Sequence, residues 1–176
     1  MQQQISRRAL ISAALATLAS SGFSRAIAQG RETWKTYFND RYGTSIEYPS
    51  RFKPGEPPAN NDGQSFTADD GAEFAVWANY NALDHDIAGL EAFLRESLEK
   101  DEKITYRAAG KNWLVLSGTQ GDKVFYKRYL LSHRNELENA FRISYPASLA
   151  ATYDPIVARI SKSLKPGRGF QTKGKP

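Results

Sequence analysis

Residues 104–145 constrain the fold more than any other stretch of this chain. They contain four runs of β-branched, aromatic and aliphatic residues, at 104–107, 112–118, 123–131 and 139–145, and short segments of glycine and polar residues separate the runs. Connections this short join only antiparallel neighbours, because a parallel crossover needs about a dozen residues or more. The sequence therefore predicts a four-stranded antiparallel meander.

The last of these runs indicates which side chains share a face. Phe141, Ile143 and Tyr145 alternate with Arg142 and Ser144, which is the period-two pattern of a strand with one apolar and one polar face. The second run is instead apolar on both faces, as in a strand that is covered on both sides. We therefore expect an antiparallel sheet with other elements packed against it.

Four further strand-forming runs precede the meander, and polar turns join them in two pairs. The runs are 34–37, 42–48, 64–67 and 72–80. The proline-rich segment 53–58 lies between the two pairs, and we expect it to be a loop because proline lacks a backbone donor.

Two amphipathic patterns predict helices that pack on the sheet. The first helix is expected at 86–100, with Asp86 as its N-cap. Its apolar stripe consists of Ile87, Leu90, Leu94 and Leu98, at spacings of three and four. The second helix is expected to begin with Asp154 as N-cap and Pro155 in its first position, and to end before Pro166. Strands followed by these helices predict the α+β class.

The composition excludes several classes of site. The chain has no cysteine, so it has no disulfide, no thiolate nucleophile and no cysteine-based metal site. The net charge of +5 comes from the two ends, because residues 29–161 hold 16 basic and 19 acidic groups. A slightly acidic body is a poor nucleic-acid binder, so we expect no nucleic-acid partner.

Residues 1–28 have the features of an export signal. Arg7 and Arg8 precede a short alanine-rich apolar run, and Ala26 and Ala28 form a signal-peptidase motif before Gln29. The paired arginines resemble the twin-arginine export signal of bacteria, although the general secretory route stays open, as does an amphipathic N-terminal helix. The prediction is a periplasmic or secreted protein whose mature form has no transmembrane segment.

The segment from Tyr42 to Phe52 carries a family resemblance. It reads Y-G-T-S-I-E-Y-P-S-R-F, and a strand of this type that ends at a proline before an aromatic residue resembles the opening hairpin of the PsbP-like and DcrB-like families. The resemblance implies an α/β/α sandwich built on an antiparallel sheet. The chain length suits a single domain, placed at residues 29–165, and the glycine, proline and basic residues that follow predict a disordered tail at 166–176. The resemblance implies no activity, because one fold serves many roles.

The sequence contains no recognisable catalytic or metal site. Asp84, His85 and Asp86 are consecutive potential ligands, but adjacent residues do not easily converge on one metal, and capping by Asp86 explains them more simply. His133 lies in a polar turn, and Ser117 lacks the strand–turn–helix context of a nucleophile elbow. No glycine-rich phosphate loop enters a helix. We therefore expect no cofactor, no metal site and no enzymatic activity.

The strands carry more aromatic residues than one face can bury, because neighbours on a strand point in opposite directions. We expect some of them to form a partner-binding surface. The candidates are Trp77, Tyr80, Tyr126 and Tyr129. The sequence thus favours an exported, non-enzymatic domain that binds or stabilises an envelope protein. Two alternatives stay open: a small-molecule or lipid-binding module with a pocket between the sheet and helix 86–100, and an enzyme with an unrecognised site.

Overall fold

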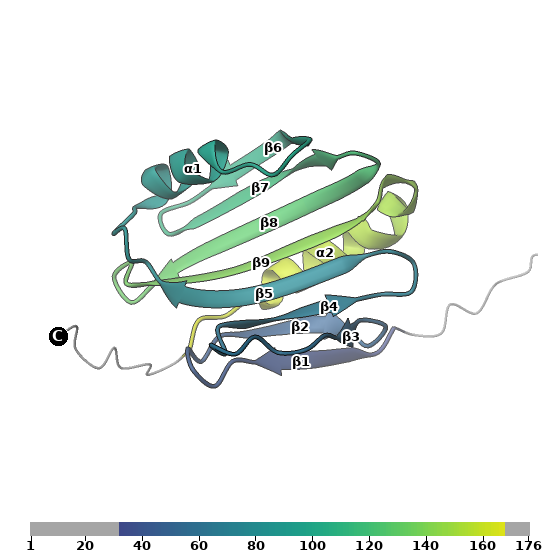
Figure 1. The fold of residues 1–176 in the computed structure, drawn as a ribbon, viewed down its shortest axis with the longest axis horizontal. Helices are drawn as coiled ribbons and strands as arrows, with labels where there is room; N and C mark the ends of the chain where they lie inside the picture. The colour runs from purple at the N-terminus through teal and green to yellow at the C-terminus, as the bar shows by residue number, and fades with distance from the viewer. Residues whose placement is uncertain (1–31, 168–176) are drawn as a thin grey trace, which may run out of the picture. The chain divides into compact units, whose positions relative to one another are not determined.

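The computed structural model describes residues 32–167, so the predicted export signal and residues 168–176 of the predicted tail lie outside the described residues. The described residues belong to one compact unit (Figure 1). The elements in chain order are β1 (Trp34–Phe38), β2 (Ser45–Pro49), β3 (Lys53–Pro54), β4 (Gly63–Thr67), β5 (Glu73–Tyr80), α1 (Ile87–Glu96), β6 (Glu102–Ala109), β7 (Trp113–Gln120), β8 (Lys123–Ser132), β9 (Leu137–Pro146), the short 3₁₀ helix η1 (Ala147–Leu149) and α2 (Ala150–Ser163).

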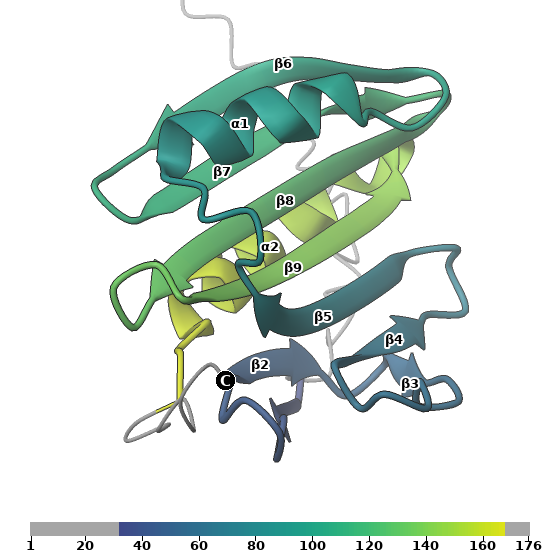
Figure 2. The same ribbon diagram turned by 60° about the vertical axis from the view of Figure 1, so that its left-hand side comes forward.

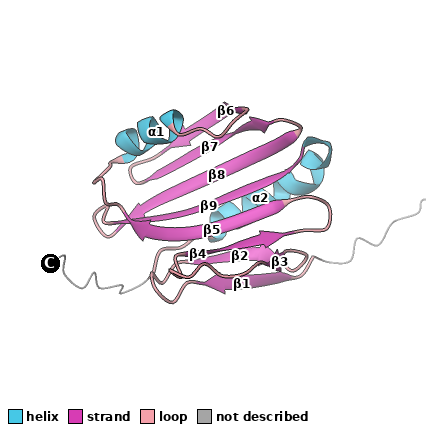
Figure 3. Ribbon diagram, in the orientation of Figure 1, coloured by secondary structure: helices cyan, strands magenta, loops and turns pink. Residues whose placement is uncertain are grey.

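The predicted meander is confirmed as β6 to β9, the larger part of a seven-stranded antiparallel sheet in the order β3-β4-β5-β9-β8-β7-β6. The first hairpin is not part of this sheet, because β1 and β2 form a separate two-stranded sheet (Figure 3). Ile46 and Tyr48 of β2 are buried in the main core. The hairpin therefore covers the core instead of lengthening the large sheet.

The two helices lie on opposite faces of the large sheet (Figure 2). Phe141 and Ile143 of β9 belong to the main core, together with Tyr153, Ile160 and other residues of α2. Ala140 of β9, one position away, belongs to a second core that includes residues of α1. This alternation gives the three layers that the sequence predicted, and the α+β class is confirmed.

Helix α1 begins where the sequence predicted and ends earlier. Asp86 caps it, because its Oδ1 accepts a hydrogen bond from the backbone amide of Gly89 at 2.8 Å. The predicted end at residue 100 is wrong, since the last helical residue is Glu96. The hydroxyl of Ser97 donates to the carbonyl of Phe93 at 2.6 Å, and a side chain that bonds the preceding turn in this way competes with helix continuation.

The predicted start of α2 is also wrong. The helix begins at Ala150, and Pro155 lies inside it. Tyr153 is fully buried in the first turn, and its hydroxyl donates to both carboxylate oxygens of Asp70 at 2.8 and 2.9 Å. This anchor holds the first turn in the core, so tertiary packing outweighs the cost of an internal proline.

Two smaller differences lie at the proline-rich loop and at the C-terminal end. The segment predicted to be a loop contains the two-residue strand β3, which pairs with β4. Gly167, within the predicted tail, is buried beside Tyr42 and Gly43. In the part of the chain that the structure describes, no helix is long and apolar enough to cross a membrane.

Candidate functional site

The sheet face that carries α2 is only partly covered. Helix α2 packs mainly against β2, β8 and β9, so a groove of about 570 Å³ lies between this helix and the outer strands. We call it the α2 groove. Its strand residues are Tyr106, Ala108, Trp113, Val115, Ser117, Val124, Tyr126, Arg128 and Tyr145, and its helix residues are Asp154, Val157, Ala158, Ser161 and Lys162.

A β-bulge places one of the groove's aromatic residues. Between Ile104 and Tyr106 the register of β6 against β7 shifts by one residue. Ile104 therefore packs against the core under α1, whereas Tyr106 lines the opposite face. Regular alternation would have put both side chains on the same face, and bulges commonly redirect a side chain in this way.

The aromatic side chains form an open apolar surface. Tyr106 is 56% exposed, and Val115 is buried at 5% exposure. Trp113 is half-buried next to the β6–β7 turn, where a Cβ atom on Gly110 would lie 2.2 Å from the indole Nε1. The hydroxyl of Tyr126 lies 2.9 Å from Ser161 Oγ, which orients its ring. The groove is therefore lined by an exposed Tyr106 together with Trp113 and Tyr126, which contacts with neighbouring residues hold in place.

Arg128 brings a positive charge into this apolar surface. Its Nη1 donates to the carbonyl and the hydroxyl of Ser161 at 2.6 and 2.9 Å, and its guanidinium carbon lies 5.9 Å from the centre of the Trp113 ring. Within residues 32–167 it forms no ion pair. Its Nε is buried and has no hydrogen-bond partner.

Two other polar groups of the groove form hydrogen bonds within the fold. Tyr145 donates to Asp154 Oδ1 at 3.3 Å. Burial, and then the nearby Asp154 carboxylate, raise the pKa of Tyr145 to about 12, so this hydroxyl stays protonated at neutral pH. Ser117 donates to the carbonyl of Phe125 at 2.7 Å. Neither Tyr145 nor Ser117 is therefore arranged as a base or a nucleophile.

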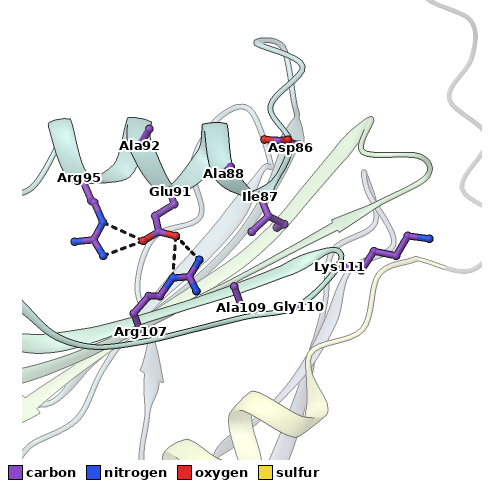
Figure 4. Close-up of a pocket in the computed structure, with 10 residues that line it drawn as sticks. All are labelled: Asp86, Ile87, Ala88, Glu91, Ala92, Arg95, Arg107, Ala109, Gly110 and Lys111. Carbon is purple, nitrogen blue, oxygen red and sulfur yellow. Dashed lines mark hydrogen bonds and ion pairs between the residues drawn. The ribbon is translucent and has the colours of Figure 1, made fainter.

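A second cavity, of about 720 Å³, lies between α1 and the end of β6 (Figure 4). Glu91 accepts from Nε and Nη2 of Arg95 at 3.0 and 2.9 Å, and from the same atoms of Arg107 at 3.0 and 2.7 Å. The hydrogen bonds from Arg107 are the main cause of a lowered pKa for the Glu91 carboxyl. The charged groups at the centre of this cavity are thus already paired.

The four aromatic residues predicted to form a partner surface do not lie together. Tyr126 lines the α2 groove. Trp77 and Tyr129 lie on the opposite face, where their ring centres are 6.0 Å apart and Tyr129 is 4% exposed. Tyr80, at the end of β5, packs edge-on against Tyr42 with ring centres 5.7 Å apart.

Sequence reasoning missed Tyr106 as a site residue. Trp113 belongs to a strand predicted to be covered on both sides, whereas its groove face is left open by α2. The only sequence signal for a bulge near Tyr106 is indirect, because Gly118 lies opposite Ile104 and glycine in a strand often marks a bulge or a close approach. Gly118 therefore indicates where the bulge lies, but it does not indicate to which face of the sheet Tyr106 points.

The residues considered for metal binding cap a helix, pack on a neighbouring ring or lie in a turn. Among the residues that the structure describes, no group of three or more histidine, aspartate or glutamate side chains could hold a metal ion. Asp86 caps α1, and the His85 ring packs on Phe93 with centres 5.5 Å apart. His133 lies in the β8–β9 turn with a φ of 51°.

Two solved structures are similar to this fold. Cyanobacterial PsbP (CyanoP) from Synechocystis sp. PCC 6803 has a TM-score of 0.56 and 11% sequence identity, and the match covers 79% of this chain and 95% of that one. The Ran-binding protein Mog1p of Saccharomyces cerevisiae has a TM-score of 0.52 and 9% identity, covering 76% and 95%. Neither a protein-family model nor a curated protein matches the sequence. The chain thus has the PsbP-like fold, as the resemblance at Tyr42–Phe52 implied.

Proposed function

We propose that this chain is an exported, non-enzymatic domain of the bacterial envelope that binds another protein through the α2 groove. One observation carries the proposal: a single open groove contains the half-exposed Tyr106 beside Trp113 and Tyr126. Aromatic residues are enriched at protein interfaces, where a few of them provide most of the binding energy.

The shape of the groove favours a protein partner over a small ligand. Small-molecule sites enclose most of the surface of their ligand, whereas Tyr106 stands exposed at the edge of this groove. The alternative pocket, between the sheet and α1, is less well supported because Glu91 already pairs with both of its arginines. Mog1p, which is a Ran-binding protein, is an example of this fold in a protein-binding role.

The N-terminal sequence supports export. Arg7 and Arg8 precede an apolar run that is too short to span a membrane, and Ala26 and Ala28 precede the predicted cleavage at Gln29. The non-enzymatic part of the proposal is supported by the groove, where the hydroxyls of Tyr145, Ser117 and Ser161 serve structural hydrogen bonds.

A paired capture experiment tests the proposal. The full chain and two variants, Tyr106→Ser and Phe38→Ser, serve as baits in an envelope extract. Both positions are exposed aromatic residues, at 56% and 58%, so both variants should fold equally well. We expect a protein that is captured by the parent chain and by Phe38→Ser, and lost with Tyr106→Ser. A set of captured proteins identical for all three baits would contradict the proposal.

A further inference from the structure

We infer that the partner presents a carboxylate to the α2 groove and that Arg128 binds it. The occupant is then a protein segment in which an aspartate or glutamate lies next to an apolar or aromatic side chain. This inference rests on the proposed function and deepens it by naming the chemistry of the recognised segment.

The unpaired edge of Arg128 is the first argument. A guanidinium offers two nitrogens, Nε and Nη2, along one edge that matches the two oxygens of a carboxylate. In the described residues neither nitrogen of Arg128 has a hydrogen-bond acceptor, and Nε is buried. A buried donor without a partner is costly, so an acceptor that reaches this edge is stabilised there.

Other arginines of the same chain show what this edge does. Arg95 and Arg107 each place Nε and Nη2 on a carboxylate oxygen of Glu91 at 2.7 to 3.0 Å. Arg159 uses the same two atoms on Glu47 at 3.0 and 2.8 Å. Arg128 differs from these three because it lines the α2 groove and no carboxylate of the described residues lies on its Nε–Nη2 edge.

The hydrogen bonds that Arg128 makes within the fold use only one of its three guanidinium nitrogens, Nη1. Nη1 bonds the carbonyl of Ser161, which belongs to the last turn of α2 and has no partner within the helix. A positive charge at this end of a helix is favourable. This contact fixes the guanidinium in place and uses neither Nε nor Nη2. A carboxylate that displaces the groups covering the buried Nε therefore finds both donors unpaired.

Charge and surface together favour an acidic protein segment. Lys162 adds a second positive charge to the groove, while its one carboxylate, Asp154, accepts the hydrogen bond from Tyr145. Tyr106, Trp113 and Tyr126 offer aromatic faces close to Arg128. A segment with an acidic residue beside an apolar one satisfies both features, whereas a basic or purely apolar segment would leave Arg128 unpaired.

The test begins with a selection of random displayed peptides on the immobilised full chain. Peptides that bind the parent chain and fail to bind Tyr106→Ser are synthesised, each with a version in which aspartate becomes asparagine and glutamate becomes glutamine. Calorimetry then measures their affinities for the parent chain, for Arg128→Lys and for the control Arg159→Lys, which alters the same residue type outside the groove. Decanoate is titrated in parallel as a probe for amphiphilic carboxylates.

We expect selected peptides to be rich in acidic residues next to aromatic ones. Removing the carboxylate should weaken binding to the parent chain by about tenfold or more, the effect of losing a charge-assisted bidentate pair. Arg128→Lys keeps the positive charge and loses the two-nitrogen edge, so it should weaken binding of the acidic peptide and reduce the cost of the amide substitution. Arg159→Lys should bind as the parent does.

The outcomes separate the inference from the proposed function. If groove-dependent peptides bind equally well without their carboxylates, the inference fails while the protein-binding function stands. If no selected peptide depends on Tyr106, both fail. If only decanoate binds, in a manner that depends on Arg128, the groove is a site for amphiphilic carboxylates and the inference of a protein segment is wrong. Amide substitution in the peptide leaves the protein unchanged, so this arm is decisive even if Arg128→Lys does not fold.

Discussion

Two glutamates near α1 each bind two basic side chains, and their burial differs. The Glu102 side chain is fully buried, with Lys127 at 2.8 Å and Arg142 at 3.3 Å. The Glu91 side chain is 15% exposed, and its two arginines are about half exposed. Desolvation offsets much of the stability gained from a buried ion pair. The more exposed ion pairs of Glu91 contribute little to stability, and that contribution follows the ionisation of one carboxylate.

The variant Glu91→Gln tests the bridge that Glu91 makes between α1 and β6. We expect it to lower the free energy of unfolding at pH 7 by about 1 kcal/mol, because solvent screens the arginines. The folded-state pKa of Glu91 is depressed. The contribution is therefore present above the ordinary glutamate pKa of about 4.3 and is lost as the pH falls through the folded-state value.

Chemical denaturation of Glu91→Gln and the parent chain between neutral and strongly acidic pH measures this. The two stability curves should converge at low pH. A difference that stays constant down to pH values below the folded-state pKa would show that the carboxylate charge contributes nothing.

At the scale of the secondary-structure elements, the groove depends on how β6 pairs with β7. Gly118 lies opposite Ile104 at the bulge, and a Cβ atom there would lie only 1.8 Å from the carbonyl oxygen of Lys103. Backbone atoms cannot yield as a flexible side chain can. The close approach of the two strands, and with it the direction of Tyr106, therefore requires glycine at this position.

Gly118→Ala should lower the free energy of unfolding by about 3 kcal/mol, because the methyl group forces β6 and β7 apart. The matched control is Gly121→Ala in the β7–β8 turn. Gly121 has a φ of 59° and no atom within 4 Å of the position of a Cβ atom, so only backbone strain of about 1 kcal/mol is expected. Equal losses for the two variants, measured by denaturant titration, would refute the close-approach argument.

The sequence predicted which helices and strands exist better than it predicted where they end and to which face of the sheet their side chains point. Runs of β-branched, aromatic and aliphatic residues between short polar turns located β6 to β9, and period-two alternation predicted the two faces of β9. The start of α2 was missed because Pro155 follows a good N-cap residue, and only the tertiary contact of Tyr153 with Asp70 explains why the helix starts earlier. The direction of Tyr106 could not be predicted, since a one-residue bulge reverses every side chain beyond it.

At the scale of the whole molecule, the fold followed from local patterns, and the site did not. The motif at Tyr42–Phe52 and the meander together implied the PsbP-like fold, and the structural similarity to CyanoP and Mog1p bears this out. The groove exists because α2 leaves part of a face uncovered. The position of a helix across a sheet depends on packing between distant residues, which no short pattern in the sequence records.

The export prediction is tested with the whole chain in bacterial cells. The double variant Arg7→Lys, Arg8→Lys keeps the charge of the n-region, and it should abolish export if the twin-arginine route is used. Fractionation and mass measurement of the parent chain should find a mature form that begins at Gln29. Normal processing of the double variant would point to the general secretory route, and an unprocessed parent chain would contradict export by a cleaved signal.

The most direct test of the central claim places a photo-crosslinking amino acid in the chain in living cells, once at position 106 and once at position 38. If the α2 groove binds a protein, irradiation should give one discrete larger adduct from position 106 and none of the same size from position 38. An identical adduct pattern from the two positions, or only uncrosslinked chain from position 106, would contradict the account.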